Sequence, residues 1–530
     1  MKHTPQEQSV SEMMKRYFLS RVEKKKQADD EQKLSVNEAI GAIAFYYEKI
    51  RNIVDYQDEH LLRQNAIRRI LGRRLIFQES MDELAYALVK ELIRSRYFAN
   101  NGLPISIVKE IEQILVMYVG IIEALRKRHI LTDKDQDWLL AMASCSIDEH
   151  LVPMTEEEAL VTLMYEMLEG QVEGSFADID DKLRKSQIYI AVYRVLLRPD
   201  ITRLRYFLLK HSFKHWTMYA EGNIEKLASE YPDISKKIDT HIKHPLNKKL
   251  MPTFRRYRIP FVVLHTSIKN NGEEILKNKE VFHKEIKRIC EGFYAVQRRR
   301  LYSRTIRAFI YIFLTKMVLG LAIELPYDLL TIHGINTTPL LINIVFPPIL
   351  LAMITLSVRF PGEENTKLII KAIEEITFSG DAKREIFIPQ RYSVKRKNPV
   401  LYVIFSILYV ALFALSFGVL WWFLRKFTFN VVSGCIFAVF LCLITFFGVT
   451  LRRSVQELMI VRKKPGLIAT FFDLFTLPIV QVGRWLSFNI SRVNIFVFIF
   501  DVLIELPLQA LIEITEEWFA FIKEKKEEME

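Results

Sequence analysis

The sequence predicts an all-α protein, in which a helical cytosolic N-terminal region is followed by a polytopic α-helical membrane domain. Two observations carry this prediction. In the first 300 residues, apolar side chains recur at the three- and four-residue spacing of amphipathic helices. The apolar runs long enough to cross a bilayer all begin after residue 305. Half of the 530 residues are hydrophobic and 26% are charged, which excludes a disordered chain and a collagen-like repeat.

The chain divides into four predicted parts. Residues 1–150 form a helical cytosolic domain, and residues 151–300 form a second one with a basic, membrane-proximal part. Residues 301–465 form the transmembrane domain, and residues 466–530 supply amphipathic membrane-associated helices and a charged cytosolic tail. The first 20 residues lack the apolar core of a signal peptide, so we expect the N-terminus to stay in the cytosol.

Local signals mark where the cytosolic helices begin. Asn101-Gly102 before Pro104 predicts a turn followed by a helix. Thr155 is followed by three glutamates, and acids in a first turn complement the helix dipole, so a helix should begin there. Asp200, directly after a proline, marks a further break between helices.

The last part of this region contains three closely spaced prolines. Pro245, Pro252 and Pro260 predict a linker or irregular loop over residues 245–260, because proline disrupts a helix interior. After Gly272, a long helical pattern runs toward the first apolar run.

Charge is uneven along the cytosolic region. Residues 101–200 hold 10 Lys and Arg against 18 Asp and Glu, a net charge of −8, whereas residues 201–300 hold 22 against 10, a net charge of +12. Arginines beside the first apolar run are candidate contacts to anionic lipid headgroups, each contributing about 1 kcal/mol of attraction. They are Arg298, Arg299, Arg300, Arg304 and Arg307. Alternatively, they only follow the positive-inside rule.

The sequence contains no motif that names an enzyme. Phosphate-binding glycine loops, dinucleotide-binding glycine patterns and nucleophile elbows are missing, so enzymatic activity stays open and we favour a protein without it. We expect no cofactor, catalytic or metal site, because no Cys-x-x-Cys pair exists and His211 and His215 lack the glutamate of a metalloprotease helix. Basic and aromatic residues alternate between Arg203 and Trp216, but without a fold signature we do not expect a nucleic-acid partner.

Four apolar runs define the membrane domain. Spans at about 308–330, 338–358, 399–424 and 427–451 each contain the roughly 20 mainly apolar residues that crossing a bilayer requires. Two further segments, at about 466–484 and 493–522, are amphipathic. We predict four spans with these two segments associated with the membrane surface, and six spans as the alternative.

Basic loops predict the orientation. Residues 358–398 carry nine Lys and Arg and residues 451–465 carry five, whereas residues 331–337 carry none. The positive-inside rule therefore places both basic loops in the cytosol. We expect a multi-pass plasma-membrane protein with both termini in the cytosol.

The first span carries ionisable residues on one helix face. Lys316, Glu324 and Asp328 share that face, and such groups are costly at membrane depth unless they are paired or hydrated. We predict an intramembrane charge network in which Lys316 pairs with Asp501 or Glu505 of the last apolar segment. Alternatively, the two acids lie among the headgroups, at a helix end terminated by the proline between them.

Two functions of different class fit this organisation. The first is a membrane-tethered scaffold or regulatory interaction protein, anchored in the lipid bilayer, whose helical region binds a cytosolic protein. The alternative is a transporter or channel with a polar-lined helical bundle. A membrane-bound enzyme acting on lipid or on the cell envelope is a third possibility, for which the sequence shows no constellation of residues.

Overall fold

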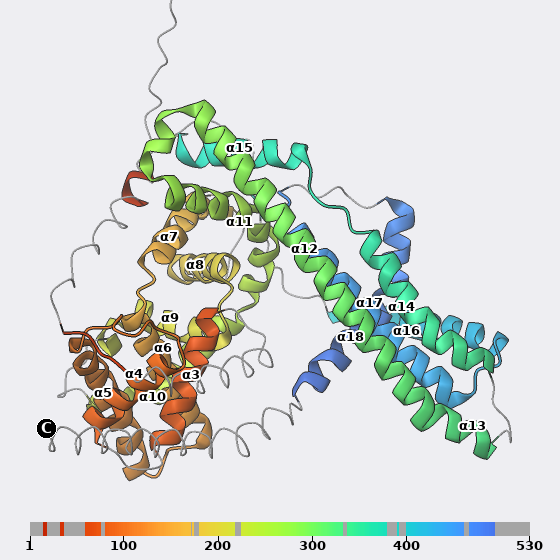
Figure 1. The fold of residues 1–530 in the computed structure, drawn as a ribbon, viewed down its shortest axis with the longest axis horizontal. Helices are drawn as coiled ribbons and strands as arrows, with labels where there is room; N and C mark the ends of the chain where they lie inside the picture. Colours follow the sequence, from red (N-terminus) through yellow and green to blue (C-terminus); the bar gives the residue numbers. More distant parts are fainter. Residues whose placement is uncertain are drawn as a thin grey trace, which may run out of the picture. The chain divides into compact units, whose positions relative to one another are not determined.

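The computed structural model describes residues 14–17, 32–36, 59–75, 80–170, 172–173, 180–217, 224–331, 337–378, 390–391, 399–460 and 466–492. Over these residues the protein is mainly helical (Figure 1). Two short strands, β1 (Val172–Glu173) and β2 (Gln390–Arg391), pair in parallel. The predicted all-α class is confirmed.

The chain folds into two compact units. The span unit takes most of its described residues from Pro252–Asn494, and the helical unit takes its described residues from Arg16–Tyr165 and Asp181–Met251. A segment from the middle of the sequence, Glu166–Asp180, also belongs to the span unit. The predicted division into four parts stays a prediction.

Capping side chains mark where α6 and α9 of the helical unit begin. The predicted break at Asp200 is confirmed, because its side chain accepts a 2.8 Å bond from the Arg203 amide and caps the helix that follows. The predicted helix start at Thr155 is also confirmed. The elements are α3 (Glu59–Arg74), α4 (Met81–Arg94), α5 (Ser106–Lys127), α6 (Asp133–Leu151), α7 (Thr155–Glu169), α8 (Asp181–Leu197), α9 (Ile201–Ser212), η2 (Lys214–Thr217) and α10 (Ile224–Lys243).

Helix α6 forms the centre of the helical unit. It is buried without interruption from Trp138 to Asp148, and it packs against α3, α5 and α9. Because a helix buried on all sides must place its polar groups among protein atoms, Asp148 needs partners inside the unit. Those partners are described with the functional sites below.

The prediction of an irregular linker over residues 245–260 is wrong. Helix α11 (Pro245–Asn271) is continuous, and Pro252 and Pro260 lie inside it. An interior proline costs roughly 3 kcal/mol, but burying a large apolar side chain contributes about 1.5–3 kcal/mol, and α11 buries nine. Seven of them recur at helical spacing: Leu246, Leu250, Phe254, Tyr257, Phe261, Leu264 and Ile268.

After α11, the span unit contains the long helix that was predicted after Gly272. Its elements are η4 (Glu273–Lys277), α12 (Lys279–Leu319), the π-helical η5 (Gly320–Glu324), α13 (Leu325–Thr331), α14 (Thr337–Leu356), α15 (Glu363–Thr377), α16 (Pro399–Lys426), α17 (Val431–Gln456) and α18 (Leu467–Arg492). Four helical stretches are long and apolar enough to cross a membrane, and each overlaps one of the four predicted spans. They are Lys279–Thr331, Thr337–Leu356, Val403–Lys426 and Val431–Gln456.

The candidate spans expose apolar side chains on a scale that water-soluble proteins avoid. Tyr311 on α12 is 70% exposed, and only 6% of the apolar stretch of α16 is buried within the protein. Continuous exposed apolar surface of this extent marks a membrane or interaction surface. The hydrocarbon interior of a bilayer around these helices would cover this apolar surface.

Helix α18 packs against α17 through a close contact at Gly483. A Cβ atom at this position would overlap the carbonyl oxygen of Cys442 and lie 2.8 Å from the Cβ of Phe446. We expect Gly483→Ala to destabilise the protein by about 1–3 kcal/mol, because backbone atoms must move to admit the methyl group. Thermal unfolding of the purified full-length protein measures this effect.

Gly418 on α16 provides the matched control. No atom lies within 4 Å of the position that its Cβ would take. Gly418→Ala should therefore leave the melting temperature unchanged or raise it slightly, since alanine favours a helix over glycine. Equal melting temperatures for the two variants would contradict the close α17–α18 contact.

Candidate functional site

The three ionisable residues of the first span are buried in the span unit. Lys316, Glu324 and Asp328 are each at most 4% exposed. The helix does not end at Pro326, so the interpretation of a proline-terminated helix end is wrong. Instead, η5 inserts one π-helical turn, in which the amide of Leu325 donates to the carbonyl of Gly320, and the helix continues to Thr331.

Asn343 of α14 bridges the lysine and the glutamate. The Lys316 Nζ donates to Asn343 Oδ1 at 3.0 Å, and Asn343 Nδ2 donates to Glu324 Oε1 at 2.9 Å. The same Nδ2 lies 3.2 Å from the carbonyl oxygen of Ser433 on α17. The Lys316 Nζ also lies 4.4 Å from the ring centroid of Phe440, a cation–π distance. The charges are therefore held at the junction of three candidate spans.

A second bond pair lies beside this network. The Asn430 Nδ2 donates to Asp328 Oδ1 at 2.6 Å, while Asn430 Oδ1 caps α17 by accepting a 2.7 Å bond from the Ser433 amide. Ser433 therefore contacts both groups, through its carbonyl and its amide. We call the set Lys316, Glu324, Asp328, Asn343 and Asn430 the polar network.

One acceptor in the polar network is unused. Glu324 Oε2 is buried and has no hydrogen-bond partner among the residues that the structure describes. A buried carboxylate oxygen without a donor is costly, because it has lost water and gained nothing. A proton on this oxygen, or a donor brought to it, would complete the network.

The sequence predicted the charged members of the network and missed their bridges. Asn343 and Asn430 are amides in otherwise apolar runs, and that isolation was the signal that could have identified them. Asp501 and Glu505 lie outside the described residues, so their pairing with Lys316 stays a prediction.

The candidate headgroup arginines lie on α12, just before the apolar stretch of this helix. Arg298, Arg299, Arg300 and Arg307 are exposed, and Arg304 is half-buried. The guanidinium of Arg298 lies 5.1 Å from the Phe360 ring centroid, and Arg307 Nε donates to a backbone carbonyl one turn earlier. Exposed Ile310 and Tyr311 follow directly. The change from basic to apolar surface fits a headgroup boundary, and lipid contact stays a prediction.

In the helical unit, the acidic and basic blocks of the sequence pair with each other. Arg203 Nη1 donates to Asp148 Oδ2 at 2.5 Å, and Lys210 Nζ lies 2.5 Å from Glu149 and 2.7 Å from Glu158. Burial opposes these charges, yet the contact lowers the pKa of Glu149 and raises the pKa of Lys210. These cations are therefore held by carboxylates of the same unit.

The two histidines of the i, i+4 pair have separate surroundings. The ring of His211 stacks on Tyr189, with centroids 4.9 Å apart, and His215 Nε2 lies 2.8 Å from Glu230 Oε2. Within the described residues, no three His, Cys, Asp or Glu side chains are arranged to hold a metal ion.

Comparisons with protein-family models, with curated proteins and with solved structures found no match. The geometry itself defines a class: an all-helical protein with four candidate membrane-spanning helices, a buried polar network between them and a separate helical unit.

Proposed function

We propose that this chain is a membrane-tethered scaffold or regulatory interaction protein, in which the helical unit binds a cytosolic protein partner. One observation carries the proposal. The chain builds a second compact unit, apart from the candidate spans, with its own apolar core and its own buried ion pairs. An anchor without a further role needs no such unit.

The proposal includes a multi-pass plasma-membrane protein with both termini in the cytosol. Contacts within the span unit support this topology, because segments predicted on one side of the membrane touch each other. Asn365 of α15 donates to the Leu458 carbonyl at 2.8 Å, and Lys279 at the start of α12 pairs with Glu374 of α15 at 2.8 Å. At the opposite end, Asn430 contacts Asp328.

Thiol labelling in intact cells tests the topology. In a background without native cysteines, Lys426→Cys at the end of α16 should react with a membrane-impermeant reagent added outside. Lys367→Cys on α15 should react only after the cells are opened. Both positions are exposed, so access to them is set by the membrane. The reverse pattern would invert the topology, and outside labelling at both positions would contradict a membrane crossing by α16, the candidate span between them.

The polar network supports the second candidate function, a transporter or channel. Buried ionisable groups and π-helical turns in membrane helices often belong to substrate or proton pathways. The unused acceptor of Glu324 is the specific observation in its favour.

Photo-crosslinking in cells separates the two functions. A crosslinking amino acid is placed at exposed apolar positions of the helical unit, Tyr86, Ile105 and Ile130, and as a control at the apolar Val403 of α16. We expect a discrete protein adduct from the helical unit and none from Val403. The adduct should persist in Glu324→Gln, which keeps the size of the side chain and removes its charge.

The transport function predicts the opposite pattern. Glu324→Gln would then abolish complementation of a deletion strain at unchanged protein abundance, and no position in the helical unit would yield an adduct. That combination of results would overturn the interaction function.

A further inference from the structure

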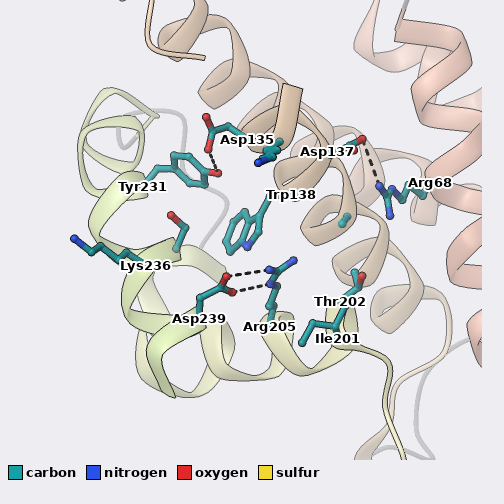
Figure 2. A pocket seen from close by; sticks show the side chains of 13 residues that line it. Arg68, Asp135, Asp137, Trp138, Ile201, Thr202, Arg205, Tyr231, Lys236 and Asp239 are labelled. Atoms are coloured by element: carbon teal, nitrogen blue, oxygen red, sulfur yellow. Dashed lines mark hydrogen bonds and ion pairs between the residues drawn. The ribbon is translucent and has the colours of Figure 1, made fainter. Parts of the chain in front are cut away.

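The helical unit contains an open cavity of about 470 Å³. It lies between α6, α9 and α10, with Arg68 of α3 at its margin (Figure 2). Its volume falls within the range of about 300–1,000 Å³ that is typical of small-molecule sites. All its lining residues belong to the helical unit.

The three carboxylates that line the cavity already have partners in its wall, as the dashed lines in Figure 2 show. Asp135 accepts from the Tyr231 hydroxyl at 2.8 Å, Asp137 lies 3.3 Å from Arg68, and Asp239 accepts two bonds from Arg205 at 2.9 and 3.1 Å. Arg68 and Arg205 therefore balance the charges of Asp137 and Asp239, whereas Asp135 is held by a neutral hydroxyl and keeps its negative charge.

Two cations of the lining remain without a partner. Lys134 in the first turn of α6 and Lys236 on α10 are exposed, and neither ammonium group forms an ion pair or a hydrogen bond within the described part of the chain. Counted over the whole lining, four cations stand against three carboxylates, so the cavity carries a net charge of +1. The guanidinium of Arg205 already pairs with Asp239, so it is not available for bidentate binding of a ligand carboxylate. The cations that remain are lysine ammonium groups, which bind phosphate as point charges, and the site therefore suits a phosphate better than a carboxylate.

Trp138 gives the cavity a rigid aromatic wall. Its side chain is 7% exposed and is held edge-on by Tyr231 and Trp216, with ring centroids 5.3 and 6.5 Å away. The indole Nε1 is buried and donates to no acceptor among the described residues. A wall fixed before binding reduces the ordering cost of taking up a ligand.

We propose that this cavity binds a small phosphorylated ligand, with Lys134 and Lys236 contacting the phosphate and the body of the ligand against Trp138. The proposal goes beyond the interaction function, because it gives the helical unit a ligand to which its partner binding can respond. Two sources share this chemistry: a soluble phosphorylated compound, and the phosphorylated headgroup of a lipid.

Calorimetric titration of pyrophosphate into the full-length protein tests the site. The protein is held in nanodiscs of phosphatidylcholine. The wild type should bind saturably, and Lys134→Met with Lys236→Met should weaken binding by about tenfold or more, since both phosphate contacts are lost. Lys237→Met is the matched control, because this lysine is the exposed neighbour of Lys236 and does not line the cavity. It should bind as the wild type does.

The lysine variants should fold as the wild type does, because all three lysines are on the surface, where substitutions change stability little. Unchanged melting temperatures would verify that the variants are folded. Absence of saturable pyrophosphate binding to the wild type, or equal binding by the double variant, would overturn the proposal.

A second arm identifies the source of the phosphate. The titration is repeated in nanodiscs that also contain phosphatidylinositol phosphate. Weaker apparent pyrophosphate binding there assigns the site to a lipid headgroup, and unchanged binding assigns it to a soluble ligand; both results support the cavity. Pyrophosphate binding without any crosslinked partner would reject only the interaction function, and an adduct without pyrophosphate binding would reject only the cavity.

Discussion

Replacing Asp148 with alanine is expected to lower the stability of the helical unit by about 3–5 kcal/mol, the range for breaking a buried ion pair from one side. The Asp148 side chain is fully buried and accepts bonds from both Arg63 and Arg203. The Arg203 side chain is only 4% exposed, and alanine would remove the carboxylate that pairs with it. Burial opposes the charge of Arg203, but Asp148 raises the pKa of the guanidinium above its usual value. The arginine would therefore stay charged and costly.

Denaturant unfolding of the full-length protein, followed by tryptophan fluorescence, measures the loss. Asp137→Ala on the same helix is the matched control, because Asp137 is 71% exposed and its pair with Arg68 lies at the surface. Such pairs contribute about 0–1 kcal/mol. Adding Arg203→Met to an Asp148→Leu variant should recover part of the loss, since an apolar pair can replace a buried ionic one. Indistinguishable unfolding midpoints for Asp148→Ala and Asp137→Ala would refute the buried network.

Lys316→Met is expected to destabilise the span unit by about 3 kcal/mol, because it leaves the Glu324 charge buried without a cation. The geometry explains why the effect should be large. Lys316 reaches Glu324 through Asn343, so its loss removes the 3.0 Å bond and leaves Asn343 Oδ1 without its donor. Glu324 Oε2 is already without a donor, so no second contact within the described network compensates.

Thermal unfolding in nanodiscs measures this loss, with Lys426→Met as the control. Lys426 is exposed at the end of α16, where its Nζ lies 4.1 Å from the Trp422 ring centroid, and its removal should cost less than about 1 kcal/mol. Adding Glu324→Gln to Lys316→Met should restore part of the stability. If Asp501→Asn restores it and Glu324→Gln does not, the pairing predicted from the sequence is correct and the Asn343 bridge is secondary.

Several features could be predicted from local patterns alone. Hydropathy over about 20 residues was sufficient for the four candidate spans, because crossing a bilayer imposes a length that any apolar run reveals. The capping preference of aspartate was sufficient to predict the break at Asp200, because the capping side chain and the amide that it binds lie within one helical turn. The charged members of the polar network were visible because ionisable side chains are rare in such runs.

Other features were decided only by contacts between distant residues. The prolines of α11 predicted a loop, but the burial of its apolar face outweighs their local cost. Asn343 connects two charges of the first span because α14 packs beside it, and no spacing in the sequence contains that information. The cavity near Trp138 collects residues from four helices. A sequence pattern reports the preferences of neighbours along the chain, whereas pairing, bridging and cavities depend on which helices meet in space.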